Sequence, residues 1–319
     1  MALCSKTKSS EQQLEAMNWW FGGKHCRSVK FLDDTAGNQA GKYWDVNVLN
    51  GDSFDATTKV YAELKYLFWL DNGVVSDPVP GPGQTLFPIP YTNGDTAEDI
   101  ADAMITAVEA DVTLNKLLKV ALMTDALDTV EYQNKFMGEV TTEVTSGATG
   151  LTFAIGSAGY GGYLGQVASG GSTLTIEHTF LEVTADQTGP TVLDELLQGT
   201  NCTVAMTLAE MTKTRWKNIV GKVFGDFVTP SVDNDVIGYG TSKLFKSSFD
   251  VVGYLVGHPI RLPASDRSMD VSILTAPKLA SINFSGTDIQ GAECEFKAYL
   301  DSSMDAKVNL LRFGDYSLL

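Results

Sequence analysis

Alternation of hydrophobic and polar residues runs through much of this chain. In Ala292–Leu300, the apolar Cys294, Phe296 and Ala298 alternate with charged residues and Tyr299. This pattern is typical of an antiparallel strand with one buried and one exposed face. Alternation or β-prone composition predicts strands over Tyr43–Leu49, Lys59–Leu70, Thr85–Tyr91, Leu117–Thr124, Asp128–Asn134, Gly138–Val144, Gly150–Ile155, Thr173–Ala185, Thr200–Met206, Ser248–Val256, Ser268–Thr275, Leu279–Phe284 and Val308–Phe313.

Two capping-box patterns predict helices. Thr96-x-x-Asp99 precedes apolar residues spaced as on one helix face, and we expect this helix to end near Asp111. Thr207-x-x-Glu210 is expected to open a second helix that stops at Gly221. A shorter helix is predicted over Ser10–Phe21. The buried stripe of the first helix would consist of Ala97, Ile100, Ala101, Met104 and Val108.

Long strands with few helices predict a mainly β fold, an antiparallel β-sandwich or barrel with one helix and an inserted small α+β domain. We place an N-terminal segment over residues 1–55, the inserted accessory domain over 56–158 and the main β domain over 159–319. The inserted domain carries fourteen acidic and five basic residues, a net charge of −9. We therefore expect it to face outward, as a hydrophilic insertion would.

A glycine-rich segment, Gly156–Gly171, precedes the long strand predicted at Thr173. It contains Gly159-Tyr160-Gly161, which resembles part of a phosphate loop. It lacks the Gly-Lys-Ser/Thr signature and leads into a strand rather than a helix, so nucleotide binding is not predicted. The segment is interpreted as a flexible connector or hinge.

Bulk composition limits the classes of function. The chain has 319 residues, 44% of them hydrophobic, which is enough for a substantial core. Its apolar runs are too short for a membrane helix, and the first residues do not resemble a signal peptide, so we expect synthesis in the cytoplasm. The net charge of −16 argues against gripping a phosphate backbone, although it would suit a surface along which a polyanion passes without sticking.

No metal, cofactor or catalytic residues are predicted. The four cysteines form no Cys-x-x-Cys pair, and the two in alternating strands, Cys202 and Cys294, are expected to be buried thiols. A disulfide between Cys4 and Cys26 stays open without support. Three histidines make a zinc site improbable. Asp233-x-Asp235 lacks the glycine and glutamate of a calcium loop.

Catalysis is not expected either. The acidic pairs Asp194-Glu195 and Glu98-Asp99 are adjacent, so their carboxylates face different directions, unlike a glycosidase pair. No serine-hydrolase elbow or zinc-protease motif is present. Four tryptophans offer surfaces for stacking on sugars, but core packing is the favoured interpretation. They are Trp19, Trp20, Trp44 and Trp69.

The order of several short motifs resembles the tail tube proteins of tailed bacteriophages. The resemblance covers about Gly171–Asp315, nearly half the chain. Residues 56–158 resemble an accessory module of phage structural proteins, on the phrases YLFWLDNG and DPVPGPGQTLFPIPYTNGDTAEDIADAM. The motifs that carry the tail tube resemblance are, in order, ADQTGPTVLDELLQGT, TLAEMTKTRWKNIVG, GYLVGHPIRLP, MDVSILTAPKLA and CEFKAYLDSSMDAKVNLLRFGD.

The resemblance implies a β subunit, also similar to type VI secretion tube proteins, that forms stacked, hexameric rings around a lumen. It implies a location in the virion and DNA passage through the bore without specific binding. The implied partners are other copies of the chain and the sheath, tape measure, baseplate and tail terminator proteins, with no membrane. Residues 1–55 and the glycine-rich connector would contact adjacent subunits.

Two alternatives remain at this stage. The first is a virion decoration or adhesion protein that uses the inserted domain to bind a host surface. The second is a tail-terminal ring protein that binds other tail proteins, because the inserted domain makes the chain longer than a minimal tube subunit.

Overall fold

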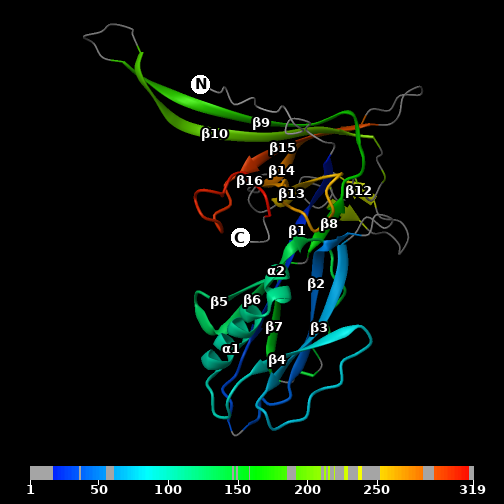
Figure 1. Ribbon diagram of the computed structural model, residues 1–319, viewed down its shortest axis with the longest axis vertical. Coiled ribbons are helices and arrows are strands. Elements are labelled where there is room, and N and C mark those ends of the chain that lie inside the picture. Colours follow the sequence, from blue (N-terminus) through cyan, green and yellow to red (C-terminus); the bar gives the residue numbers. More distant parts are fainter. Residues whose placement is uncertain are drawn as a thin grey trace, which may run out of the picture.

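The computed structural model is mainly β, as predicted, with a large antiparallel sheet and smaller separate sheets (Figure 1). It describes residues 17–35, 37–54, 61–145, 147–148, 150–157, 159–184, 192–209, 212, 215, 219, 226–228, 236–238, 252–282 and 291–315. Within these ranges the structure contains two helices.

The largest sheet runs through the whole molecule. Three short strands join it from the side: β7 (Thr152–Ser157) and β8 (Tyr160–Tyr163) pair with β1, and β16 (Arg312–Phe313) pairs with β14. Each of these pairings is antiparallel. The spatial order of the other strands is β5 (Leu118–Met123), β6 (Ala126–Met137), β1 (Met17–Lys30), β13 (Gly253–Pro259), β14 (Val271–Ile282), β15 (Ala292–Tyr299), β10 (Val192–Leu208) and β9 (Val167–Thr184).

Strand β1 connects the two halves of the molecule. Its first part, up to Gly22, pairs with β13, and its second part, from Lys24 to Lys30, pairs with β6 and β7. The helix predicted over residues 10–21 is therefore wrong for 17–21, which are strand; residues 10–16 lie outside the described part. Both faces of this stretch are buried, so it lacks the polar alternation that marks a half-exposed strand.

Two hydrophobic cores lie on either side of this junction. The first, which we call the Trp19 core, is formed by β1, β10, β13, β14 and β15 and includes Phe21, Val204, Leu255 and Phe296. The second, the Trp20 core, lies in the lower half of Figure 1 and includes Trp44, Phe68, Ile100 and Tyr132. Most of the fully buried aromatic rings belong to the Trp20 core.

A three-stranded sheet and two helices enclose the Trp20 core. Strand β2 (Tyr43–Phe54) pairs antiparallel with β3 (Tyr61–Asp71), and β3 pairs parallel with β4 (Gln84–Pro90). Helix α1 (Ala97–Ala110) begins at the predicted capping box, with Thr96 and Asp99 bonded to each other's backbone amides. Its buried residues are the five predicted ones, and a short helix α2 (Val112–Leu117) that was not predicted follows it.

Strand pairing crosses the boundary that we predicted between residues 55 and 56. Strand β2 belongs to the predicted N-terminal segment, yet Tyr43 pairs with Trp69 and Trp44 with Phe68 of β3. The second part of β1 likewise pairs with β6 and β7. The Trp20 core therefore draws on residues from both predicted segments.

The glycine-rich segment 156–171 is not the flexible connector predicted from its composition. It contains the end of β7, all of β8 and the start of β9. Gly161 has φ +93°, and a Cβ there would lie 2.1 Å from the Phe21 carbonyl oxygen. Glycine is required because β8 approaches the backbone of β1 more closely than any side chain would permit.

Several other elements differ from expectation. Thr207 lies inside β10, paired with Glu293, so it does not cap a helix; the predicted helix 208–221 falls mostly outside the described residues. The two strands predicted around Ala276 and Pro277 are one strand, β14, with a register shift after Pro277. The predicted strand 138–144 has no regular structure. The predicted loop 227–241 contains parts of a small hairpin, β11 (Asp226–Val228) and β12 (Val236–Gly238).

Candidate functional site

The most conspicuous surface feature is the hairpin formed by β9 and β10. The two strands are 18 and 17 residues long and pair antiparallel from Val167–Leu208 at the base to Thr184–Val192 at the far end. In Figure 1 the hairpin extends well beyond the body of the molecule. A surface that projects in this way is available to reach another molecule.

The base of the hairpin is firmly anchored in the Trp19 core. Cys202, Val204 and Met206 of β10 are buried there, and the same strand pairs with β15. The Trp19 indole Nε1 also donates a 3.1 Å hydrogen bond to the Ser172 hydroxyl of β9. The base is anchored because successive side chains of a strand point to opposite faces, so every second residue of β10 packs into the core.

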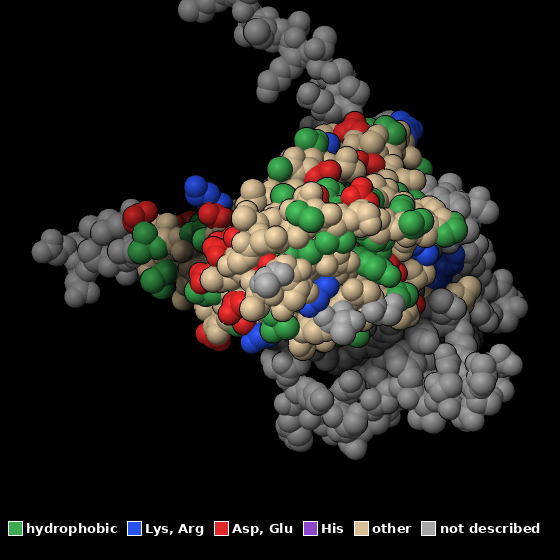
Figure 2. All heavy atoms as spheres, turned by 90° about the horizontal axis from the view of Figure 1, so that it is seen from below, with side chains coloured by type: hydrophobic (Ala, Val, Ile, Leu, Met, Phe, Trp, Pro, Cys, Tyr) green, Lys and Arg blue, Asp and Glu red, His purple; other side chains and the backbone are tan. Residues whose placement is uncertain are grey.

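The outer part of the hairpin exposes apolar side chains on both faces. Phe180 pairs with Leu197 and Leu181 pairs with Leu196, and adjacent residues of a strand point to opposite faces. Each face therefore carries one apolar pair, and all four side chains are between 50% and 60% exposed. Figure 2 shows hydrophobic side chains near the described end of the projection at its left. Clustered exposed apolar residues of this kind mark interaction sites.

The hairpin is also acidic. Residues 167–208 contain five Asp or Glu residues and no Lys or Arg. Glu182 lies directly opposite Glu195, an arrangement that disfavours the isolated hairpin because like charges repel across the pair. A cationic group from a neighbouring molecule would relieve that repulsion.

All four tryptophans are buried: Trp19 lies in the Trp19 core, and Trp20 and Trp44 lie in the Trp20 core. Trp19, Trp20, Trp44 and Trp69 are 2%, 3%, 0% and 2% exposed. The core interpretation is confirmed, and stacking of these rings on sugars is wrong.

The described cysteines are buried, free thiols. Cys202 and Cys294 lie in the Trp19 core, as predicted, and burial raises the pKa of the Cys294 thiol to about 12. Cys26 donates a 2.7 Å hydrogen bond to Glu131; its burial and that bond raise its pKa to about 12. Such thiols are protonated and unreactive near neutral pH. Cys4 lies outside the described residues, so the disulfide with Cys26 that the sequence left open is not tested.

The acidic pairs singled out from the sequence have local roles. Asp99 caps helix α1, and Asp194 accepts a 2.8 Å hydrogen bond from the backbone amide of Glu195. Asp233 and Asp235 lie outside the described residues. Within the described part of the chain, His, Cys, Asp and Glu side chains do not gather in threes to hold a metal ion. No helix in that part is long and apolar enough to cross a membrane.

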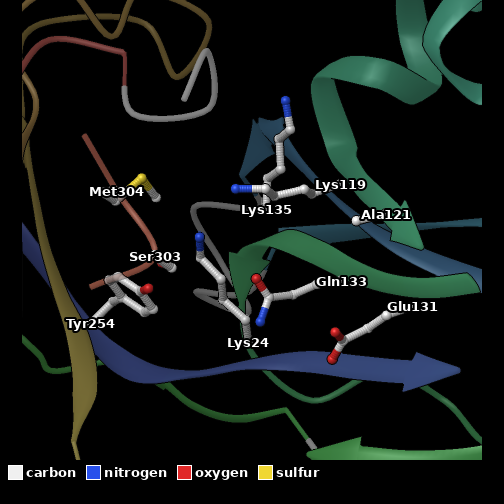
Figure 3. A pocket seen from close by; sticks show the side chains of 9 residues that line it. All are labelled: Lys24, Lys119, Ala121, Glu131, Gln133, Lys135, Tyr254, Ser303 and Met304. Carbon is white, nitrogen blue, oxygen red and sulfur yellow. The ribbon is translucent and has the colours of Figure 1, made fainter. Parts of the chain in front are cut away.

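A second surface feature, which we call the lysine pocket, was missed by the sequence analysis. It is a cavity of about 250 Å³ between the outer face of the β5–β6–β1 sheet and the loop after β15 (Figure 3). Its residues are far apart in the chain, so no local motif marks them. They are Lys24, Lys119, Ala121, Glu131, Gln133, Lys135, Tyr254, Ser303 and Met304.

Comparison with known proteins assigns neither feature a role: no protein-family model and no curated protein matches this chain. The hairpin, the charge of the chain and the sequence motifs are therefore the features from which a function can be inferred.

Proposed function

We propose that this chain is a structural subunit of a phage tail tube, assembling with copies of itself into stacked, hexameric rings around a lumen through which DNA passes. The observation that carries the proposal is the β9–β10 hairpin, anchored at its base and apolar on both faces beyond the body. The order of the sequence motifs between residues 171 and 315 supplies the identity of the assembly.

The proposed rings require contact between copies in a head-to-tail manner. In them the apolar pairs of the hairpin would lie on a different surface of the neighbouring copy, which makes the contact heterologous. Heterologous contacts generate closed rings or open helical stacks rather than simple dimers. Burying each of Phe180, Leu181, Leu196 and Leu197 would contribute up to about 1.5–3 kcal/mol of association free energy.

The charge of the chain supports passage of DNA rather than its capture. At −16 per subunit, a ring of several copies would be strongly anionic. Like-charge repulsion keeps a polyanion from settling on such a wall. The proposed location is the virion, and the other proposed partners are sheath, tape measure, baseplate and tail terminator proteins.

A second candidate is a tail-terminal ring or virion decoration protein. It is favoured by the connection between β3 and β4, where Val74 and Val79 are 78% and 91% exposed. In Figure 2, which views the molecule from below, hydrophobic side chains are spread among acidic ones over the end of the lower half. Such a surface would suit contact with a partner other than the chain itself.

The test is electron microscopy of the purified full chain at high concentration, compared with hairpin and control variants. We expect six-fold rings or stacked tubes for the wild type, and their loss in Phe180→Ser combined with Leu197→Ser. The matched control is Leu127→Ser, which changes a side chain of similar exposure on β6 and should leave assembly intact.

Circular dichroism of the same samples separates loss of assembly from loss of folding. Rings that persist in the hairpin double variant would contradict the role given to β9 and β10. A wild-type chain that stays monomeric alone, but joins a ring when mixed with tail proteins, would favour the terminal ring or decoration protein.

A further inference from the structure

The lysine pocket brings together cationic side chains from three strands. Lys24 comes from β1, Lys119 from β5 and Lys135 from β6. Strand pairing explains their proximity, because Lys119 of β5 and Cys26 of β1 both pair with Gln133 of β6. Lys24 lies two residues before Cys26 on β1, and Lys135 lies two residues after Gln133 on β6. Figure 3 shows Tyr254, Ser303 and Met304 facing the sheet residues Lys119, Gln133 and Glu131 across the pocket.

The loop after β15 is held rigidly over the pocket by Asp301. This buried carboxylate accepts hydrogen bonds from the Tyr254 hydroxyl (3.0 Å), the Ser303 hydroxyl (2.6 Å) and the Arg312 guanidinium (2.8 Å). Its hydrogen bonds go to these three donors, while its charge also acts on Lys24. Glu131, the carboxylate that lines the pocket, accepts a hydrogen bond from Cys26.

The cations around the pocket oppose one another. Lys24 is only 9% exposed, and its ammonium lies 4.5 Å from the centre of the Tyr254 ring. Burial lowers its pKa to about 8, and the positive charges of Arg312, Lys119 and Lys135 act in the same direction against the opposing effect of Asp301. Burial and the charge of Lys119 also lower the pKa of Lys135, against the opposing effect of Asp315. An anion in the pocket would relieve this repulsion.

We propose that the lysine pocket binds a tetrahedral oxyanion, phosphate or sulfate, either free or as the end group of a small molecule. A cavity of about 250 Å³ holds such a group with a few waters, since one water takes about 30 Å³ of liquid volume. Lysine ammonium groups bind phosphate and sulfate through charge-assisted hydrogen bonds. The site is independent of whether the chain forms a tube.

The test is isothermal titration calorimetry of the full chain with sodium sulfate and with sodium phosphate, using sodium chloride to hold ionic strength constant. We expect saturable binding of one anion per chain. Lys24→Met keeps the aliphatic stem against Tyr254 but removes the charge, and should weaken binding by at least about tenfold. Lys135→Gln should also weaken anion binding. This variant replaces Lys24→Met in the test if Lys24→Met does not fold.

The matched control is Lys116→Gln, which makes the same charge change at an exposed position on α2, outside the pocket. Its affinity should stay within about twofold of wild type, because an exposed charge at a distance is screened by salt. Absence of saturable binding, or equal weakening by the control, would overturn the proposal.

Proton linkage gives a second readout. Near pH 8, Lys24 is partly neutral, and sulfate binding should draw a proton onto it. The binding heat should then differ between two buffers of different ionisation enthalpy, and this difference should vanish in Lys24→Met. A heat that is the same in both buffers would place the anion away from Lys24 and overturn the assignment.

The source of the oxyanion is distinguished by a titration with single-stranded DNA at equal phosphate concentration. We expect no binding that depends on Lys24, because the proposal places a free or terminal oxyanion in the pocket. Lys24-dependent DNA binding that is tighter than phosphate binding would replace the proposal with a nucleic-acid site. If neither anion binds but Lys24→Met abolishes self-assembly, the pocket takes a carboxylate of another copy, and the oxyanion proposal fails.

Discussion

Trp19 and Trp20 are neighbours in β1, yet they are buried in different hydrophobic cores. Trp19 packs with Phe21, Leu255 and Phe296, whereas Trp20 stacks on Tyr61 at a ring separation of 5.8 Å. The cause is the two-residue period of a strand, which sends successive side chains to opposite faces. Strand β1 therefore contributes side chains to both cores and separates them with its backbone.

The first prediction concerns these two tryptophans. Trp19→Ala and Trp20→Ala should each reduce the free energy of unfolding by about 3–5 kcal/mol, because each leaves a large cavity. Hydrogen exchange should localise the damage, with protection lost first in β13–β15 for Trp19→Ala and in β2–β3 for Trp20→Ala. Val79→Ala, at a position 91% exposed, is the control and should change little. The same exchange pattern in both variants would show that the cores are not separable.

The second prediction uses two glycines of positive φ. Gly161→Ala should destabilise the chain by more than the about 1–2 kcal/mol cost of a left-handed residue, because its Cβ would meet the Phe21 carbonyl oxygen at 2.1 Å. Gly171→Ala has a φ of +75° and open space around it, so only the backbone cost of about 1–2 kcal/mol applies. Urea denaturation of both variants measures the difference. Equal losses would mean that β8 moves away from β1 at no cost.

The third prediction concerns the buried pair of Asp301 and Arg312. Burial acts to raise the pKa of Asp301, but hydrogen bonds from Ser303 and Tyr254 and the charge of Arg312 outweigh it, and the pKa is lowered. The resulting stability is fully present above the unfolded pKa of about 3.9 and is lost as pH falls through the lower folded value.

Asp301→Ala should therefore cost about 3–5 kcal/mol at pH 7, since it leaves the Arg312 charge buried without its carboxylate. The difference from wild type should shrink in strong acid, where Asp301 of the wild type is protonated as well. Urea denaturation at both pH values is the measurement, with Asp77→Ala at an exposed loop position as the control. A difference that does not change with pH would exclude ionic stabilisation by Asp301.

The fourth prediction concerns His258, whose two ring nitrogens both face acceptors. Nδ1 lies 2.6 Å from the Asp270 carboxylate and Nε2 lies 3.1 Å from the Leu262 carbonyl oxygen. Burial acts to lower the pKa of His258, but the bond to Asp270 and the charge of that carboxylate outweigh it, and the pKa is raised. The protonated ring donates at both nitrogens, so it closes the turn between β13 and β14.

A raised histidine pKa stabilises the fold below the unfolded value of about 6.5, and this contribution disappears as pH rises through the folded pKa. The Tm of the wild type should decline over that range relative to His258→Gln, which cannot titrate. His178→Gln on the exposed hairpin is the control and should follow the wild type. Parallel curves for wild type and His258→Gln would rule out the protonated pair.

Several elements were predictable because their signals are local. Helix α1 begins at Thr96, and its buried face matches the predicted positions, since capping and helical period act within a few turns. Strand β15 shows the alternating burial expected of its sequence. The prediction matched most of β9, but it covered only residues 200–206 of β10, and the outward exposure of Phe180 and Leu197 was not predicted.

Other features depend on partners distant in the chain. Residues 17–21 are buried by segments distant in the chain, from Tyr61 to β13, so their own pattern did not indicate a strand. The parallel pairing of β3 with β4 and the close approach of Gly161 to Phe21 likewise have no local signature. The lysine pocket is the extreme case, because its cations come from three strands.

The sequence by itself determined the mainly β class, the position and face of α1, the burial of Cys202 and Cys294 and the strongly acidic charge. Each of these follows from short-range periodicity, side-chain chemistry or composition. Only the tertiary structure decided that β1 serves two cores, that the hairpin leaves its apolar pairs exposed, and that Lys24, Lys119 and Lys135 share a cavity. The physical reason is that strand pairing brings together residues that are distant in the chain. The alternation of apolar and polar residues within one strand does not specify which other strands pair with it.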